Sequence, residues 1–283
     1  MTRYALNPAM PVLSRPDGVV QVGWDPRRAV LVRPPSGVSV GTLGAVLRAL
    51  QSGATLAQLQ DIGDGLDAVT VADLVAELVD AGLVTVAHRL RSRSANIRIH
   101  GRGPLSDLLA GALRCSGARI THSSQPHAGA NPQMTDLVVL SDSLVADPRI
   151  LRDLHHTATP HLPVRVRDGA GLVGPLVVPG VTSCLRCADL HRSDRDEGWP
   201  AVAAQLRDAV GTADRATVLA TAAVALNQVD RVIAAVRGGV GVERAPHPPS
   251  TLDTTLEFDV NTGSTTARRW TRHPRCPLCA GSN

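Results

Sequence analysis

The 283-residue chain contains no lysine, so all 29 of its basic side chains are arginines. This absence excludes functions that require a lysine, such as Schiff-base catalysis or a phosphate-binding loop built around a lysine. Aromatic residues make up only 2% of the chain. A hydrophobic core must therefore be built mainly from alanine, valine and leucine. The absence of lysine has a simple explanation in a GC-rich genome and does not by itself indicate a function.

The charge and hydropathy patterns exclude further classes of protein. The net charge is only +4 and the arginines are spread along the chain, with no dense basic run typical of a nucleic-acid tail. No stretch reaches the ~18 consecutive apolar residues of a membrane span. The start of the sequence, MTRYALNPAM, also lacks the apolar run of a signal peptide. We therefore expect a cytoplasmic protein with no membrane partner, in which thiols stay reduced.

Four of the five cysteines form two Cys-x-x-Cys pairs, Cys184 with Cys187 and Cys276 with Cys279. In a reducing compartment, four thiolates supply the complete tetrahedral shell of a structural zinc site. Such a closed shell would hold the end of the sequence to a segment about 90 residues earlier, which closes a long loop. Two disulfides, a redox dithiol or bound iron are the alternatives. Cys115 lies in a helical pattern, where we expect it to be buried in packing.

Residues 1–88 form a predicted N-terminal α+β module. Short strands are expected around turn signals in residues 11–32, followed by three helical patterns and a final strand. A small sheet with three helices is typical of a winged-helix-like arrangement. Residues 89–96 are polar and basic and are predicted to be a linker. Helix boundaries are indicated by Thr55 and Thr70 as N-caps and by Gly53 and Gly82 as helix ends.

Residues 97–283 begin with the pattern of a Rossmann-type unit, so the fold class is predicted to be α/β. A strand, a glycine turn at Gly101 and Gly103, a helix and a second strand follow one another, and Asp142 ends the next strand. The long helical pattern at 212–237 is expected to be largely buried, and a hairpin follows it. We expect His155, His156 and His161 to be ordinary polar residues at a helix end and not metal ligands.

This order of elements, with its two cysteine pairs, resembles the ThiF/MoeB adenylyltransferase superfamily, which activates ubiquitin-like carrier proteins. The resemblance covers about residues 96–281, and the four cysteines match the family's zinc ligands. The segment CLRCADLHRSDRDEGWP is similar to actinobacterial cyclodehydratase-like proteins of thiazole/oxazole peptide (bacteriocin) pathways. In those proteins the N-terminal module resembles the PqqD-like winged helix that captures a leader peptide. The resemblance implies a peptide or a partner enzyme as the binding partner, and a homodimer.

The sequence departs from active members of this family where ATP should bind. Only about a dozen residues separate the second strand from the third, and the expected ribose-binding acid, arginine, lysine and additional strand are missing. Gly101, Gly103 and Asp142 remain as candidate cofactor-binding residues. Asp142 either matches the family's magnesium-binding aspartate or is a plain strand-end aspartate. We therefore expect neither ATP nor magnesium to bind, and predict a pseudo-adenylyltransferase with no catalytic residue.

A charged segment follows the first cysteine pair. It would lie beside the metal and could be a solvated surface, a recognition surface for a partner, or an acid/base set. The five recognition candidates are His191, Arg192, Asp194, Arg195 and Asp196.

Three functions compete at this level. The first is a scaffold that captures a peptide along a strand edge. The second is an active adenylating enzyme in which Arg98 and Arg102 contact phosphate. The third is a DNA-binding sensor of a dinucleotide, which the acidic third helix disfavours because a groove-reading helix carries basic residues. Its charged residues are Asp73, Glu77 and Asp80.

Overall fold

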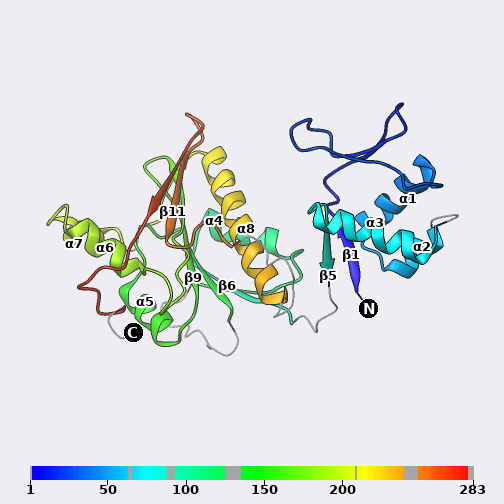
Figure 1. Cartoon of the computed structure of the whole chain (residues 1–283). Coiled ribbons are helices and arrows are strands. Elements are labelled where there is room, and N and C mark those ends of the chain that lie inside the picture. The colour runs from blue at the N-terminus through cyan, green and yellow to red at the C-terminus, as the bar shows by residue number, and fades with distance from the viewer. Residues whose placement is uncertain are drawn as a thin grey trace. The chain divides into compact units, whose positions relative to one another are not determined.

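We describe the protein from a computed structural model that covers residues 2–62, 66–87, 93–124, 135–207, 209–238 and 248–279. The chain divides into two compact units, each described here by itself (Figure 1). Unit 1 comprises Met1–Ser92 and Gly238–Ala245, and unit 2 comprises Arg93–Arg237 and Pro246–Asn283. Residues 89–92 of the predicted linker, and the segment 125–134 between the second and third strands of the predicted Rossmann-type unit, lie outside the described residues.

Unit 1 contains two small antiparallel sheets and three helices. One sheet pairs the first strand of the chain with the last strand of the unit, and the other has three strands in the order β2-β3-β4. A winged-helix assignment for this unit stays a prediction. The elements are β1 (Arg3–Leu6), β2 (Val12–Ser14), β3 (Val20–Val22), β4 (Val30–Val32), α1 (Val40–Gln51), α2 (Leu56–Ile62), α3 (Ala68–Asp80) and β5 (Val84–Ala87).

Side-chain caps define where the helices of unit 1 begin. Thr55 caps α2 as expected: its Oγ1 accepts from Gln58 N at 3.3 Å, while Gln58 Oε1 accepts from Thr55 N at 3.0 Å. The prediction of Thr70 as the cap of α3 was wrong. Asp67 is the cap, because its carboxylate accepts a 2.6 Å hydrogen bond from Thr70 N and so starts the helix three residues earlier.

The core of unit 1 follows the apolar periodicity of its helices. Leu43, Val46, Leu47 and Leu50 of α1 are completely buried, as the spacing predicts, and pack with apolar residues of α3 and of strand β3. The opposite face of α3 is exposed and acidic. That face carries Asp73, Glu77 and Asp80.

Unit 2 is built on a seven-stranded mixed sheet in the order β12-β11-β10-β9-β8-β6-β7. The four strands β7, β6, β8 and β9 are parallel, and the remaining neighbours pair antiparallel. The strands are β6 (Asn96–His100), β7 (Arg119–Ser123), β8 (Leu137–Ser141), β9 (His161–Arg167), β10 (Ala170–Val173), β11 (Thr254–Asp259) and β12 (Ser264–Arg269). The predicted opening strand–turn–helix–strand unit and the terminal hairpin are both present.

Helices cover both faces of this sheet. Strand β8 shows the division: Leu137 and Val139 face the core that α4 and α8 cover, whereas Val138 and Leu140 face α5 and α6. In Figure 1, α8 runs along the sheet. The helices are α4 (Pro104–Leu113), α5 (Pro148–His156), α6 (Leu185–Ser193), α7 (Trp199–Gln205) and α8 (Arg215–Gly238).

Two burial predictions in unit 2 were wrong. Helix α8 is long and apolar enough to cross a membrane by length and composition, yet only 33% of that apolar window is buried. One face of α8, including Ala225 and Val229, packs on the sheet, while Leu219 on another face is 46% exposed. Small residues on all sides of the helix hid this asymmetry in the sequence. Cys115 is exposed because α4 ends before it, at Leu113.

Candidate functional site

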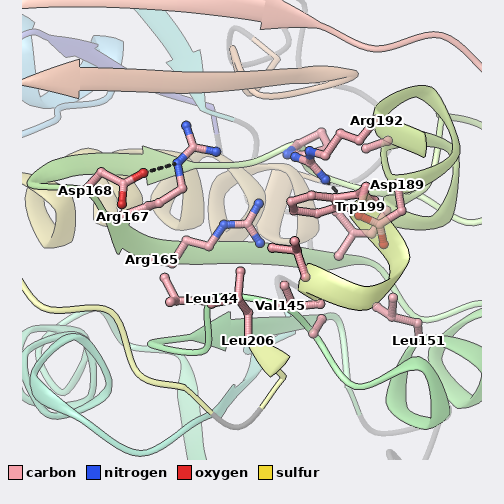
Figure 2. Close-up of a pocket in the computed structure, with 15 residues that line it drawn as sticks. Leu144, Val145, Leu151, Arg165, Arg167, Asp168, Asp189, Arg192, Trp199 and Leu206 are labelled. Atoms are coloured by element: carbon pink, nitrogen blue, oxygen red, sulfur yellow. Dashed lines mark hydrogen bonds and ion pairs between the residues drawn. The ribbon is translucent and has the colours of Figure 1, made fainter. Parts of the chain in front are cut away.

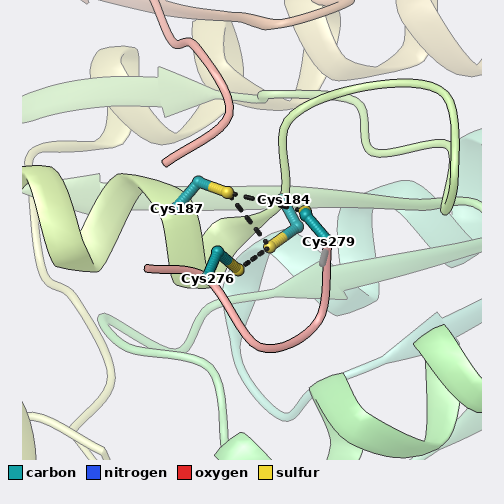
Figure 3. A group of neighbouring side chains, drawn as sticks. All are labelled: Cys184, Cys187, Cys276 and Cys279. Carbon is teal, nitrogen blue, oxygen red and sulfur yellow. Dashed lines mark hydrogen bonds between the residues drawn. The ribbon is translucent and has the colours of Figure 1, made fainter. Parts of the chain in front are cut away.

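The two cysteine pairs meet in unit 2, where the chain end returns to the start of α6 (Figure 3). Their Sγ atoms lie 3.7 Å apart for Cys184 and Cys187, 3.5 Å for Cys184 and Cys276, and 3.6 Å for Cys187 and Cys279. A disulfide needs a much shorter S–S distance of ~2.0 Å. Four sulfurs bound tetrahedrally at ~2.3 Å from one zinc ion lie about 3.8 Å apart. The described thiols therefore form a cluster that could hold a metal such as zinc.

The protonation of these thiols also favours a cation at their centre. A hydrogen bond from Cys184 lowers the pKa of Cys187 to about 4, whereas burial raises the pKa of Cys279 to about 12. Burial and the Cys187 thiolate thus keep Cys184 and Cys279 protonated, because further negative charges at this spacing would repel one another. A divalent cation would remove that conflict by allowing all four thiols to ionise.

A second group of possible metal ligands lies beside the cysteines. His191, Asp194 and His273 bring two ring nitrogens and a carboxylate oxygen within 4.8 Å of one another. However, His273 Nδ1 accepts a hydrogen bond from Arg275 N at 3.1 Å, so its Nε2 carries the proton that Asp194 accepts at 2.8 Å. The Arg275 guanidinium also pairs with Asp194. The polar atoms of His273 and Asp194 are thus hydrogen-bonded within the protein. The group fits a role in holding the C-terminal segment against α6.

The predicted cofactor residues Gly101, Gly103 and Asp142 come together at the carboxyl ends of β6 and β8. This is the position where the strand order changes direction and where ligands bind in open α/β sheets. Here the Asp142 carboxylate occupies the start of α4: Oδ1 accepts from Leu105 N and Oδ2 from Ser106 N, each at 3.0 Å. A protein side chain thus takes amide donors of the kind that bind phosphate in dinucleotide-binding folds.

Close packing against Asp142 and its neighbour explains both glycines. A β-carbon on Gly101 would lie 2.2 Å from the carbonyl oxygen of Ser141, and one on Gly103 would lie 2.7 Å from Asp142 Oδ1. The glycines are therefore needed for the approach of β8 to the glycine turn, with or without a ligand. Asp142 itself is 2% exposed and has a positive φ of 71°.

A cavity of about 270 Å³, called here the glycine-turn cavity, adjoins this turn. Its lining includes Gly101 and three arginines, Arg102, Arg165 and Arg207. Arg98, the other arginine considered as a phosphate contact, is 9% exposed and donates to Ser123 Oγ at 3.1 Å. Of the two arginines beside the glycines, only Arg102 therefore lines the cavity.

The five recognition candidates do not form one surface. The segment is helical up to Ser193, and His191 and Asp194 contact the C-terminal segment through Thr271 and His273. Arg192 points instead into a cavity, where it donates to Asp189 at 2.8 Å and lies over the rings of Trp199 and Trp270. Arg195 and Asp196 are exposed.

Arg165 and Arg167 line the same cavity as Arg192, although no sequence motif pointed to them. The signal was present in residues 161–167, HLPVRVR, where two arginines alternate with apolar residues in a strand. In a strand that becomes buried, two charged side chains on one face indicate a polar site.

The interpretation of the three histidines was only partly correct. His156 is exposed at the end of α5, but His161 begins strand β9 and is completely buried. Its pKa is lowered to about 4 because burial penalises the imidazolium. The rings of His155 and His161 meet edge to face, with centroids 5.6 Å apart, and neither Nε2 has a hydrogen-bond partner among the described residues.

Solved structures with a similar fold place these observations in context. No protein-family model matches the sequence, and no curated protein matches it. The structure of the heterocyclase TruD matches 99% of this chain and 43% of its own, with a TM-score of 0.70 and 18% identity. The chain shares the fold of this heterocyclase and of MccB. The ATP complex of E. coli MccB matches 98% of this chain and 99% of its own, with a TM-score of 0.58 and 11% identity.

A second heterocyclase, solved in complex with substrate and cofactor, matches 99% of this chain with a TM-score of 0.70 and 15% identity. This chain spans about two fifths of the heterocyclases' length, since it covers 43% and 40% of them. The likeness shows that the chain has the fold of these heterocyclases and of MccB, in agreement with the α/β fold that the sequence motifs predicted. At these identities it concerns the fold alone.

Proposed function

We propose that this chain is a zinc-containing scaffold of a peptide-modification pathway, which binds a peptide or a partner enzyme in the cytoplasm and does not adenylate it. The observation that carries the proposal is the position of Asp142. Its carboxylate accepts from the two backbone amides at the start of α4, at the glycine turn. A nucleotide phosphate would have to displace a like-charged group from these donors.

Unit 1 supplies features suited to peptide binding. Trp24, which follows β3, is 77% exposed, and Leu13 of β2 and Leu31 of β4 are 41% and 53% exposed. Strands β2 and β4 are the edges of the three-stranded sheet, so each has free backbone groups for an added strand. An exposed tryptophan at the end of this sheet favours recognition of an extended peptide with apolar side chains.

The neighbours in structure support a peptide as the partner class. One heterocyclase was solved with its substrate, and the microcin C7 biosynthetic enzyme MccB was solved with N-formylated MccA. Because the MccB match extends over 98% of this chain, it includes unit 1 as well as unit 2. We therefore place peptide capture in unit 1 and a structural role in unit 2.

Zinc would have a structural role in this protein. Cys184, Cys187, Cys276 and Cys279 would fill its four positions and leave none for water or substrate. Bound there, the ion would supply four bonds that connect α6 to the C-terminal segment.

One observation favours an active adenylating enzyme as the second candidate. The glycine-turn cavity is lined by Arg102, Arg165 and Arg207, which together could offset phosphate charge. The third candidate, a DNA-binding sensor, is weakened by the exposed acidic face of α3, which would repel the phosphate backbone.

Calorimetric titration of the zinc-loaded full chain with Mg-ATP tests the proposal. We expect no binding heat at millimolar nucleotide, and no ATP–pyrophosphate exchange with or without added peptide. Tight, magnesium-dependent binding that is lost in Arg102→Gln would instead support the adenylating enzyme. The Asp142→Ala variant provides a second test, because removing the carboxylate frees the amides of α4 and should allow phosphate to bind.

A further inference from the structure

A second cavity of unit 2, the arginine cavity, has a volume of about 330 Å³ (Figure 2). It lies between strand β9 and helices α6 and α7. Three arginines line it: Arg165 and Arg167 from β9 and Arg192 from α6. Figure 2 shows the guanidinium of Arg165 between Arg167 and Trp199. Its volume is at the lower end of the range for small-molecule sites, which begins at about 300 Å³.

Two of these three positive charges have acidic partners. Arg167 contacts both Glu257 oxygens, at 3.1 and 3.2 Å, and lies 3.7 Å from Asp168. Arg192 donates to Asp189 at 2.8 Å. The cations of Arg167 and Arg192 are thus already balanced before any ligand enters.

Arg165 differs from the other two arginines. The described residues give its guanidinium no hydrogen-bond acceptor and no ion pair within 4 Å, although the residue is only 9% exposed. Asp189 acts on Arg165 from a longer distance and is hydrogen-bonded to Arg192. Burial and the nearby Arg192 lower the pKa of Arg165 to about 10, so the group stays charged at neutral pH. A buried, charged guanidinium without an acceptor is unfavourable, and a bound anion would remove that cost.

Apart from Asp168 and Asp189, which also line it, the remaining walls of the cavity are apolar. The indole of Trp199 forms one side, and its Nε1 has no acceptor among the described residues. Large aliphatic side chains from the loop after β8, from three helices and from the end of α7 form much of the rest of the lining. They are Leu144, Val145, Leu151, Leu185, Val202 and Leu206.

We propose that the arginine cavity binds a single carboxylate carried on a short apolar chain, with Arg165 as the residue that pairs with it. The planar guanidinium matches the two oxygens of a carboxylate. Arg165 offers one guanidinium without a hydrogen-bond acceptor, which suits a single carboxylate. The acidic Asp168 and Asp189 that also line the cavity would repel a phosphate, with about two negative charges, more strongly. The aliphatic wall and Trp199 then contact the hydrocarbon part of the ligand.

This site is distinct from the glycine-turn cavity, although Arg165 borders both. Of these two cavities, Arg167, Arg192 and Trp199 line the arginine cavity alone, and Arg102 and Gly101 line the glycine-turn cavity alone, while Ala146 borders both, as Arg165 does. Variants can therefore separate the two sites. The proposal also stands apart from the scaffold function, because it concerns unit 2 and requires no peptide in unit 1.

Titration calorimetry on the zinc-loaded full chain, with hexanoate as probe, tests the assignment. We expect hexanoate to bind and its neutral analogue hexanamide to bind at least about tenfold more weakly, because the charged hydrogen bonds are lost. Arg165→Gln should weaken hexanoate binding by a similar factor, and Val202→Trp should weaken it by filling the cavity. Arg102→Gln, which changes only the other cavity, should leave it unchanged.

The outcomes divide clearly. Equal binding of hexanoate and hexanamide, no binding at millimolar hexanoate, or full affinity in Arg165→Gln would overturn the proposal. Tighter binding of inorganic phosphate than of hexanoate would overturn the carboxylate assignment. The same titration with a short peptide ending in leucine, and with its C-terminally amidated form, identifies which kind of molecule carries the carboxylate. If the peptide with a free carboxylate binds selectively and more tightly than hexanoate, the natural ligand is a peptide C-terminus. If that peptide binds more weakly than hexanoate, the natural ligand is a free organic acid.

Discussion

Asp142 Oδ1 lies only 2.7 Å from the place that a β-carbon on Gly103 would occupy. The same oxygen accepts a hydrogen bond from Leu105 N at 3.0 Å, so the contact joins the glycine turn, the end of β8 and the start of α4. The capping of α4 by Asp142 therefore depends on the absence of a side chain at Gly103.

Gly103→Ala should destabilise unit 2 by about 2 kcal/mol, since the methyl group must push the carboxylate away from the helix amides. Gly111→Ala is the matched control within α4, because no atom lies within 4 Å of its added β-carbon. That variant should be neutral or stabilising by up to about 1 kcal/mol. Urea unfolding can be followed by fluorescence in a Trp24→Phe background, which leaves Trp199 and Trp270 as reporters in unit 2. If the two alanine variants had equal free energies of unfolding, Asp142 would be able to move aside without destabilising unit 2.

The cysteine cluster predicts one bound zinc per chain and a large loss of stability when the metal is removed. The cluster closes a loop of about 90 residues, and opening such a loop should cost about 4 kcal/mol. Metal analysis, followed by thermal unfolding with and without chelator, measures both quantities.

Cys276→Ser should lower zinc content and unit 2 stability together, because it removes a ligand that is 1% exposed. Cys115→Ser is the control, since that thiol is exposed and lies outside the cluster. If Cys115→Ser lost zinc as well, or if Cys276→Ser kept it, the four-cysteine assignment would fail.

Local patterns were enough to predict most elements of the fold. The glycine turn, strand β8, helix α5, the terminal hairpin and the two cysteine pairs each have a signal within about a dozen residues. Strand β1 was missed because its partner β5 is some 80 residues away, as in the pairing of Tyr4 with Val86. The contact of Asp142 with α4 likewise depends on how β8 packs beside β6.

Features that arise only from packing could not be read from the sequence. Arg165 resembles any other arginine until β9 becomes an inner strand of the sheet. The extent of burial of α8 was overestimated because alanines occupy its exposed side as well as its buried side. Periodicity identifies a helix of this composition, but it does not identify which face is covered.

Trp24 provides a test of peptide binding in unit 1. Trp24→Ala should weaken binding of linear peptides selected from a displayed library by about tenfold or more, because exposed aromatic side chains dominate such contacts. The melting temperature should not change, since the side chain is 77% exposed. Val181→Ala is the control, an apolar residue of unit 2 that is 72% exposed. Peptides that bind both variants equally would place recognition outside the β2-β3-β4 sheet.

His161 predicts a loss of stability in mild acid. Burial lowers its pKa from 6.5 to about 4, so below pH 6.5 the unfolded chain takes up a proton that the folded chain does not. The contribution of His161 to the free energy of unfolding is therefore fully present above pH 6.5. It falls as the pH drops towards 4, by about 3 kcal/mol in total. Burial also lowers the pKa of His100 and of His155, and both act in the same direction.

The contribution of His161 can be isolated by comparing His161→Gln with His156→Gln. Glutamine at position 161 keeps a donor for the carbonyl of Thr159, which the ring Nδ1 now contacts at 3.1 Å, but it cannot titrate. The difference in unfolding free energy between pH 7 and pH 4.5 should therefore shrink in His161→Gln. It should stay at the wild-type value in His156→Gln, because that side chain is exposed. A wild-type pH dependence in His161→Gln would mean that the acid sensitivity of unit 2 comes from other groups that bind more protons in the unfolded chain than in the folded chain, such as carboxylates whose pKa folding lowers.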